Sequence, residues 1–211
     1  MMAEIDRPRQ PTCLPDFDHV NRYWDRANKI WAAKILPGQY YVSKYGDEVI
    51  ATTLGSCVSA CIRDNKLGIG GMNHFMLPLK HEHGSEDWMG AATRYGSYAM
   101  EHLINDILKA GGKRKNLEVK LAGGGKIVAN MSDVGQRNID FVLDYLQTEN
   151  LDVFVQDLGD VHPRKVLYYP DSGRLRVKRL RSLHNETLVE REKSYQQELE
   201  VQPDSGGVEL F

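Results

Sequence analysis

Two different hydrophobic periodicities follow one another in the middle of this chain, and they limit the folds open to it. Between residues 40 and 77, short apolar runs rich in β-branched residues alternate with polar or glycine turns, a pattern typical of strands. The strands expected from these runs are 40–42, 49–54, 58–62 and 67–77. From residue 93 to 109 the apolar positions recur at helical spacing, which predicts a long amphipathic helix closed by the glycine pair 111–112.

The second half of the chain adds further strands and one more helix. A short strand at 117–121 leads into three glycines, and a helix is predicted to begin near Asp133, where Gln136 completes a pattern similar to a capping box. Further strands are expected at 151–155, 165–169 and 175–180, the last two joined by a hairpin turn at 170–173. Strands outnumber helices and occur in hairpins. The pattern therefore favours a layered α/β or α+β sandwich over a doubly wound parallel sheet.

The two ends of the chain differ from its middle. Residues 1–20 contain several prolines and little periodicity, and we interpret them as an irregular N-terminal arm. Apolar residues at helical spacing then predict an amphipathic helix over residues 23–35. The last stretch, 184–211, is rich in Glu and Gln and is expected to be a disordered tail. A single folded domain over residues 21–183 fits a chain of 211 residues.

Composition excludes several classes of partner and location. The chain carries 27 basic and 29 acidic residues, a net charge of −2, which gives no electrostatic reason to expect nucleic acid or an anionic membrane as a partner. Its apolar runs are far shorter than the ~18–20 residues that span a bilayer, and the N-terminus has no apolar signal region. Three widely spaced cysteines argue for a reducing compartment. We therefore expect a cytoplasmic protein without direct membrane insertion.

A cysteine and a histidine in the strand-rich region are the candidates for chemistry. Cys57 ends an apolar, threonine-bearing run directly after Gly55-Ser56, and His74 follows seventeen residues later, after Gly70-Gly71. A nearby imidazole raises the thiolate fraction of a cysteine and orients its attack, so the pair is typical of a nucleophile and its base. The alternative for both residues is simple packing, because free cysteines are most often small buried hydrophobes.

Neighbouring motifs have simpler interpretations. Cys61 fits a packing role, and a disulfide to Cys57 is excluded because four strand steps separate the two Cα atoms by about 13 Å, beyond the ~7 Å limit. The glycines at 70–71 and 123–125 are expected to let backbone approach a substrate or to supply N–H donors to an oxyanion. The run at 123–126 lacks the spacing of a P-loop, so ATP and GTP are rejected. His81-Glu82-His83 lacks further metal ligands and is expected to be a solvated loop.

Six blocks of sequence, taken in order, resemble a known family. They are Leu54-Gly55-Ser56-Cys57-Val58, Gly70-Gly71-Met72-Asn73-His74-Phe75-Met76-Leu77-Pro78, Arg94-Tyr95-Gly96 with Ala99-Met100, Gly123-Gly124-Gly125 with Asn130-Met131, Gly135-Gln136-Arg137-Asn138, and Asp171-Ser172-Gly173. With their spacing they cover about residues 38 to 180, and they resemble the chemoreceptor glutamine deamidase family CheD of bacterial chemotaxis. The resemblance implies a compact three-layer α/β/α sandwich with a hairpin-rich mixed sheet, similar to the cytotoxic necrotizing factor toxins.

The resemblance also implies a reaction. Selected glutamine side chains of methyl-accepting chemotaxis receptors would be hydrolysed to glutamate, with no cofactor and no metal. Cys57 would be the nucleophile and His74 the base, while Gly55 and Ser56, with Gly70 and Gly71, would bind the substrate and its oxyanion. A CheC-type phosphatase is implied as a second partner where the organism has one.

The family has a threonine shortly before the cysteine as the third member of its site. Six positions before Cys57 this chain has Ala51, and Thr52 and Thr53 follow. Thr53 lies two positions after 51 and so points to the same face of a strand. We therefore expect Thr53 to orient His74, with Thr52 as the alternative.

The chain also departs from the family pattern at 126–129 and at 159–164. If the second of these segments contacts the substrate, an altered receptor preference would follow.

Two other functions fit the same residues. One is a non-catalytic chemotaxis module that docks a CheC-type phosphatase and keeps an idle cysteine. The other is a cysteine amidase or peptidase that acts on other amides. The presence of both Cys57 and His74 favours a working enzyme.

Overall fold

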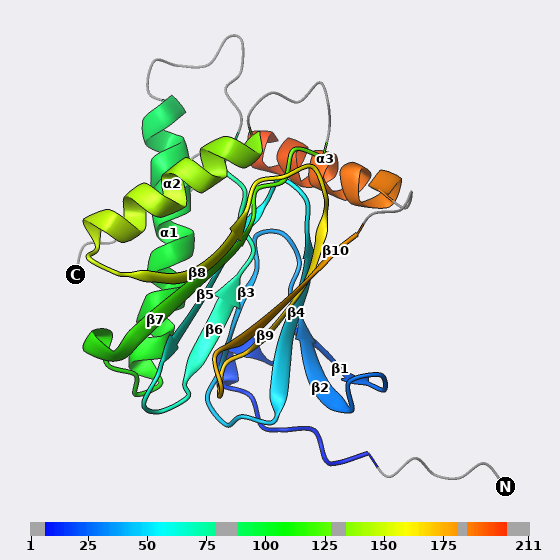
Figure 1. Ribbon diagram of the computed structural model, residues 1–211, viewed down its shortest axis with the longest axis vertical. Coiled ribbons are helices and arrows are strands. Elements are labelled where there is room, and N and C mark those ends of the chain that lie inside the picture. The colour runs from blue at the N-terminus through cyan, green and yellow to red at the C-terminus, as the bar shows by residue number, and fades with distance from the viewer. Residues whose placement is uncertain (1–6, 79–87, 128–133, 181–184, 202–211) are drawn as a thin grey trace, which may run out of the picture.

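The computed structural model describes residues 7–78, 88–127, 134–180 and 185–201 (Figure 1). Within them, ten strands form two five-stranded sheets. Sheet A contains, in spatial order, β1 (Asn21–Asp25), β2 (Ile30–Lys34), β4 (Glu48–Leu54), β9 (Arg164–Tyr169) and β10 (Arg174–Arg179). Sheet B contains β3 (Tyr40–Ser43), β6 (Gly70–Asn73), β5 (Val58–Asp64), β7 (Leu117–Gly123) and β8 (Val153–Leu158).

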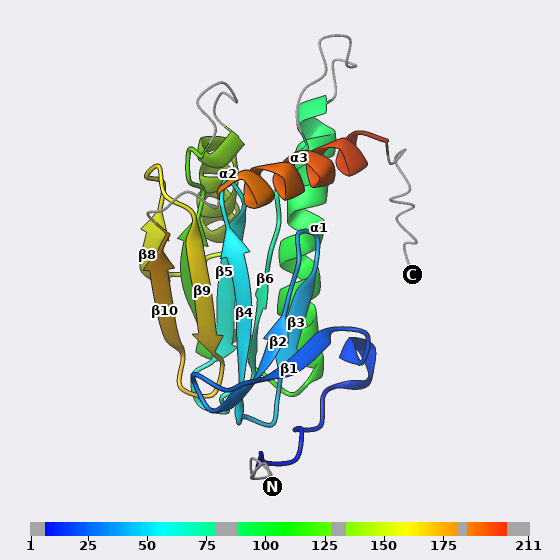
Figure 2. The same ribbon diagram turned by 90° about the vertical axis from the view of Figure 1, so that its right-hand side faces the viewer.

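Helices cover one sheet and one end of the strands. The described helical elements are α1 (Trp88–Lys109), α2 (Val134–Thr148), α3 (Asn185–Val201) and the short 3₁₀ turns η1 (Pro15–Phe17) and η2 (Arg114–Asn116). α1 and α2 lie along sheet B, and α3 crosses above the ends of the central strands (Figures 1 and 2). Within the described residues, no helix combines the length and the apolar character needed to cross a membrane.

The main hydrophobic core connects both sheets and the two long helices. It includes Ile50 and Tyr168 from sheet A, Ile62 and Met72 from sheet B, and Leu103 from α1. These contacts confirm the predicted mixed α/β, α+β-like class. The strands are divided between two sheets, where the sequence suggested one mixed sheet.

The chain passes from one sheet to the other next to the candidate cysteine. β4 belongs to sheet A and β5 to sheet B, so residues 55–57 connect the two sheets where β4 ends and β5 begins. Each strand is paired on both sides: β4 with β2 and β9, and β5 with β6 and β7. This crossing is therefore anchored at both ends by central strands.

Several elements predicted from periodicity are confirmed. α1 and α2 cover the two expected helical segments, and β9 and β10 form the expected hairpin. In its turn, the Gly173 N–H donates to the Tyr169 carbonyl at 2.8 Å. The capping residue expected at Asp133 and the segment His81-Glu82-His83 lie outside the described residues.

The helix expected over residues 23–35 is wrong, because this segment forms the antiparallel hairpin β1–β2. The Asp25 carboxylate accepts the N–H groups of Ala27 and Asn28 at 2.9 and 3.0 Å and closes the turn. Trp24 lies directly opposite Trp31, with ring centroids 6.0 Å apart. Such cross-strand aromatic pairs stabilise a hairpin, and here they outweigh the helical spacing of the apolar residues.

Both chain ends contribute more structure than expected. Phe17 and Val20, from the segment interpreted as an irregular arm, belong to the main core. Residues 185–201, expected to be disordered, form α3, with Leu188, Glu192 and Gln196 buried on one side. This four-residue spacing is that of a helix face, but two of its three members are polar, so the segment lacks a hydrophobic periodicity.

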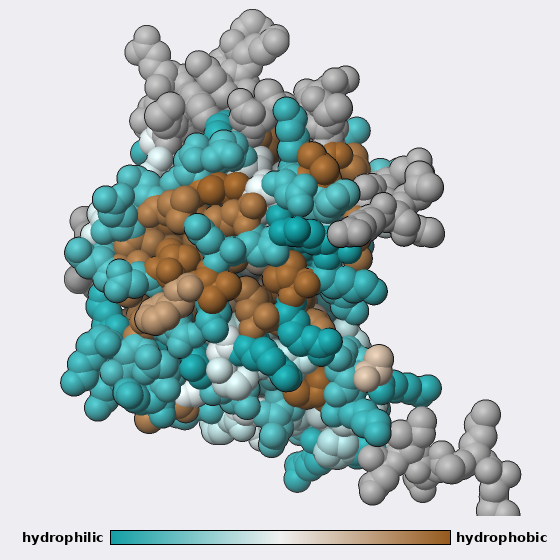
Figure 3. All heavy atoms as spheres, in the orientation of Figure 1, coloured by the Kyte–Doolittle hydropathy of each residue, from teal (hydrophilic) through white to brown (hydrophobic). Residues whose placement is uncertain are grey.

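One surface outside the core is strongly apolar. Figure 3 shows apolar side chains gathered over α2 and β8, where Leu143, Phe154 and Val155 are exposed. β8 is also the outer strand of sheet B. Exposed apolar patches and open sheet edges are typical of surfaces that contact other proteins.

Phe17→Ala tests whether the N-terminal segment belongs to the folded domain. Phe17 is 3 % exposed and packs edge-on against Tyr40 and Tyr41. Its removal is expected to lower the free energy of unfolding by about 3–5 kcal/mol, measured by urea denaturation. Asp18→Ala, at an exposed neighbour, is the control and should change stability by less than about 0.5 kcal/mol. Equal effects of the two variants would contradict this boundary.

Candidate active site

The pairing of β5 with β6 brings Cys57 and His74 together. The register of the two strands continues to a bridge in which Val58 and Phe75 exchange two N–H···O bonds of 3.0 Å. Cys57 precedes Val58 and His74 precedes Phe75, so the two residues are diagonal neighbours on the same side of the strand pair. Diagonal neighbours in antiparallel pairs lie about 7–8 Å apart, within reach of an aromatic side chain.

The ring of His74 is held by Thr52 of sheet A. The Thr52 hydroxyl lies 2.8 Å from His74 Nδ1 and 2.9 Å from the Ile35 carbonyl oxygen. A hydroxyl has one proton and a carbonyl only accepts, so Thr52 donates to Ile35 and accepts from an Nδ1–H of His74. This arrangement selects the tautomer whose Nε2 carries the free electron pair, as a general base requires.

Burial sets the protonation state of His74. The residue is 2 % exposed, and burial, with a smaller contribution from the charge of Arg191, lowers its pKa from 6.5 to about 3. The ring is therefore neutral near pH 7. Among the described residues, no group makes a hydrogen bond to His74 Nε2, so this nitrogen is available to accept a proton.

Cys57 is a protonated thiol in this arrangement. It is fully buried, and burial raises the pKa of the thiol well above its usual value. The carboxylate of Glu192 raises this pKa further, through its charge and through a hydrogen bond with the thiol. Cys57 therefore combines the position of a nucleophile with an environment that suppresses its thiolate form.

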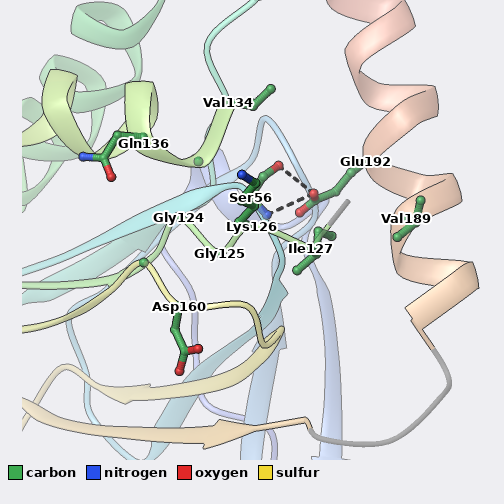
Figure 4. Close-up of a pocket in the computed structure, with 12 residues that line it drawn as sticks. Ser56, Gly124, Gly125, Lys126, Ile127, Val134, Gln136, Asp160, Val189 and Glu192 are labelled. Atoms are coloured by element: carbon green, nitrogen blue, oxygen red, sulfur yellow. Dashed lines mark hydrogen bonds between the residues drawn. The ribbon is translucent and has the colours of Figure 1, made fainter. Parts of the chain in front are cut away.

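Consecutive backbone N–H groups beside Cys57 converge on one carboxylate. Glu192 of α3 accepts from the Gly55 N–H at 2.9 Å. It also accepts from the Ser56 N–H at 3.0 Å and from the Ser56 hydroxyl at 2.7 Å (Figure 4). The Cys57 N–H lies 3.5 Å from the same carboxylate. Successive N–H groups that point to one place form an anion-binding nest. Beside a nucleophile, such donors can stabilise an oxyanion.

Two buried asparagines hold the surrounding backbone in place. Asn138 of α2 accepts from the Leu77 N–H and donates to the Ser56 carbonyl, both at 2.8 Å. Asn73 accepts from the Ala60 N–H at 2.8 Å, so its side chain replaces a backbone acceptor of the β5–β6 ladder. These contacts connect the cysteine turn to α2 and fix the strand end that carries the histidine.

The glycine run 123–125 is hydrogen-bonded to the turn at residues 55–57 that carries Cys57. Gly124 and Gly125 donate their N–H groups to the carbonyls of Cys57 and Gly55 at 2.8 and 2.7 Å. Gly123 has a φ of +118°, and a Cβ there would lie 2.2 Å from the Cys57 carbonyl oxygen, so a side chain does not fit. The N–H groups of Gly124 and Gly125 are used within the chain, which contradicts the expectation that this run supplies oxyanion donors.

The structure corrects the expected position of the threonine. Thr52, the alternative, contacts His74. Thr53 is only partly buried and is paired with Lys165 of β9. Successive side chains of a strand point to opposite faces, and the face of β4 that meets sheet B is the one that carries Thr52. Strand parity with position 51 therefore selects the wrong face.

Gly70 and Gly71 are also placed differently from the expectation. They lie inside sheet B, opposite Ser43 and Val42 of β3. A Cβ on Gly71 would come within 2.4 Å of the Tyr41 carbonyl oxygen. These glycines allow close packing in the sheet, whereas Gly55 and Ser56 do contribute donors to the nest beside Cys57.

The residue that fills this nest carries almost no signal in the sequence. Glu192 lies in the segment expected to be disordered, and the only local signal is the four-residue spacing it shares with Leu188 and Gln196. Asn138 belongs to one of the sequence blocks, but nothing in the sequence indicates that its amide joins Ser56 to Leu77. Among the described residues, no group of three or more His, Cys, Asp or Glu side chains could hold a metal ion.

α3 separates two hollows next to these residues. One, of about 190 Å³, has Ser56 and Glu192 in its wall and is also lined by residues 124–127, 134–136 and 159–160 (Figure 4). The other, of about 260 Å³, is lined by residues 38–40 and 73–75, by α1, and by Tyr195 of α3. His74 is among the residues that line the second hollow, whereas Cys57 lines neither.

Comparisons with known proteins agree with the sequence blocks. The family model described as "CheD chemotactic sensory transduction" matches residues 76–179. A protein of Halorhodospira halophila is 55% identical over 204 residues, which cover 95% of this chain and 94% of that protein. A protein of Hahella chejuensis is 50% identical over 201 residues, 95% of each chain. Both are described as "probable chemoreceptor glutamine deamidase CheD".

The lowered pKa of His74 predicts a loss of stability in acid. Below pH 6.5 the histidine of the unfolded chain takes up a proton, but in the folded protein it stays neutral down to its pKa of about 3. Relative to a His74→Gln variant, the wild type is expected to lose up to about 1.4 kcal/mol of stability per pH unit within this window. Urea denaturation of both proteins between pH 7 and 4.5 measures the difference. A difference that does not change with pH would contradict a buried neutral ring.

Proposed function

This chain belongs to the CheD family, and we propose that it is a chemoreceptor glutamine deamidase, a hydrolase. It converts the side-chain carboxamide of selected glutamines in methyl-accepting chemotaxis receptors to a carboxylate and releases ammonia. The observation that carries this proposal is the position of Cys57 beside a neutral His74 with a free Nε2. The converging donors at residues 55–57 support it.

The first half of the reaction forms a thioester. His74 Nε2 takes the proton of Cys57, and the sulfur attacks the carbonyl carbon of the glutamine side chain. The carbonyl oxygen becomes an oxyanion in the nest formed by the N–H groups of residues 55–57. When the C–N bond breaks, the protonated His74 gives its proton to the leaving nitrogen, and ammonia departs.

The second half regenerates the thiol. His74 Nε2 takes a proton from water, and the resulting hydroxide attacks the thioester carbon at the same oxyanion site. The C–S bond breaks, the sulfur recovers a proton, and a glutamate side chain is released. The sum is one carboxamide and one water giving one carboxylic acid and one ammonia, so the proposal includes no cofactor.

Thr52 is a positioning residue in this scheme. Its hydroxyl accepts the Nδ1–H of His74, which keeps the free electron pair on Nε2 in each step at which the ring is neutral. The remaining proposals rest on the family. They are a cytoplasmic location, where the modified parts of the receptors would be met, and a CheC-type phosphatase as a second partner.

Cys57→Ser is expected to reduce deamidation to background, because a serine hydroxyl is far less acidic than a thiol and gives almost no nucleophile here. The measurement is incubation with a purified receptor cytoplasmic fragment, followed by peptide mass spectrometry for conversion of Gln to Glu. Cys61→Ala is the matched control and should keep most of the activity, because Cys61 is buried away from these donors. Wild-type protein that converts only small amides would favour the cysteine amidase. Protein that converts nothing would favour the non-catalytic module.

Thr52→Val is expected to lower kcat with little change in KM. The decrease in kcat can approach the ~10²–10⁴-fold contribution of a positioned acid–base group. The reason is that the ring of His74 is no longer held in one tautomer and one orientation. Thr52→Ser keeps the hydroxyl and should retain most of the activity. Thr53→Val, on the other face of β4, should stay near wild type. Activity lost in Thr53→Val and kept in Thr52→Val would reverse the assignment of the two threonines.

A further inference from the structure

The side chain bound in the nest beside Cys57 comes from the chain's own C-terminal helix. Glu192 is 5 % exposed and receives the N–H groups of Gly55 and Ser56 together with the Ser56 hydroxyl. A glutamate side chain is also what remains when the carboxamide of a glutamine has been hydrolysed. Glu192 is therefore chemically identical to the product of the proposed reaction.

These donors require an acceptor at this point. Ser56 and Cys57 are buried, and a buried donor without a partner is costly. The donors that converge here are matched to a carboxylate or carboxamide oxygen, and Glu192 supplies one. The same position, next to the Cys57 sulfur, is the one where the oxygen of a substrate carboxamide would be bound.

α3 closes access to the reacting groups. With α3 in place, Cys57 is 0 % and His74 2 % exposed, and the Tyr195 hydroxyl of α3 contacts the Tyr95 hydroxyl of α1. Gln196, one turn after Glu192, is also buried. A glutamine of another protein therefore needs a rearrangement to reach Cys57, and movement of α3 would vacate the donors that Glu192 now holds.

Where α3 meets the rest of the domain, some buried polar atoms lack a hydrogen-bond partner among the described residues. Both amide atoms of Gln196 and Nε2 of His74 are buried without a hydrogen-bond partner in the described part of the chain. No backbone–backbone hydrogen bond joins α3 to either sheet among those residues. Buried unpaired groups oppose docking, and a helix attached only through side chains can leave without breaking a sheet.

We propose that α3 is an internal competitive ligand of the active site. Glu192 holds the position of the substrate carboxamide, and α3 must be displaced before a receptor glutamine can react. The proposal rests on the proposed function and adds its regulation.

Glu192→Ala tests the proposal with a readout that does not depend on deamidation. Removal of the carboxylate takes away the acceptor of the Gly55 and Ser56 N–H groups and of the Ser56 hydroxyl. It should release α3 and increase the rate of Cys57 alkylation by iodoacetamide at least about tenfold, since the loss of even one charge-assisted hydrogen bond corresponds to such a factor. Peptide mapping assigns the alkylated cysteine. Cys61, fully buried on β5 of sheet B, should stay protected if the fold is intact. Glu190→Ala, at an exposed glutamate of the same helix, is the matched control and should react like the wild type.

The same variants are then compared on the receptor fragment. Glu192→Ala should have a lower KM than wild type and Glu190→Ala, because the substrate no longer competes with α3. The proposal about α3 is overturned if Glu192→Ala leaves the alkylation rate unchanged, or if alkylation becomes faster without a gain in deamidation. In either case the proposed function stands as long as the wild type deamidates the fragment. If no variant deamidates the fragment, the proposed function fails, and alkylation alone decides whether α3 closes the site.

Glu192→Gln tests whether the side chain at position 192 occupies the place where a substrate carboxamide would react with Cys57. The introduced carboxamide should be hydrolysed within the molecule, with release of ammonia and restoration of an acid at position 192, seen by mass spectrometry of the peptide. The conversion should not depend on protein concentration and should be absent when Cys57→Ser is also present. If the Glu192→Gln variant deamidates the receptor fragment but keeps its own amide at position 192, this side chain lies outside the reacting position and the proposal is overturned.

Discussion

The two hydrogen bonds between Val58 and Phe75 fix the geometry on which the candidate site depends. They extend the pairing of β5 and β6 to the point where the chain enters from sheet A, and so bring His74 beside Cys57. The third member of the site comes from the other sheet, because Thr52 lies on β4. The proposed nucleophile therefore lies at the crossing between the sheets, the proposed base at a strand end of sheet B, and the hydroxyl proposed to orient it on sheet A. Packing between the sheets, and not a local loop, sets the orientation of the imidazole.

The closed arrangement has a second consequence, which concerns reactivity and not only access. A carboxylate next to a thiol opposes thiolate formation, and Glu192 raises the pKa of Cys57 in this way, in addition to the effect of burial. If Glu192 leaves, the negative charge goes with it, while the N–H groups of residues 55–57 stay and favour a negative charge on sulfur or oxygen. Departure of α3 would therefore expose Cys57 and activate it in the same step. A resting protein with a protonated, covered thiol is also protected from adventitious alkylation and oxidation.

What the sequence predicts correctly in this protein is what local periodicity and residue chemistry determine. α1, α2 and the β9–β10 hairpin carry strong local signals. Residue type and context also single out Cys57 and His74, which lie together in the fold, while their catalytic roles stay predictions. The β1–β2 hairpin was not predictable in this way, because its apolar residues also fit a helical face and only strand pairing decides between the two. The choice of Thr52 over Thr53 depends on which face of β4 meets sheet B, which is a tertiary fact. Glu192 was missed because a buried polar stripe gives no hydrophobic signal, and its partners are backbone N–H groups distant in sequence.

The balance between docking and release of α3 determines how such a protein responds to its substrate. A ligand that binds only the open state has its affinity reduced by the fraction of molecules that are open. If α3 favours the closed state by about 3 kcal/mol, close to the net worth of two charge-assisted hydrogen bonds, apparent affinity falls by roughly 150-fold. The amide of Gln196, which has no hydrogen-bond partner among the described residues, would act against this preference. A protein that presents several glutamines close together provides a high local concentration of competing side chains, whereas an isolated glutamine does not. The internal helix would thus favour glutamines that are presented close together, which is a form of substrate selection achieved without any contact beyond the reacting side chain.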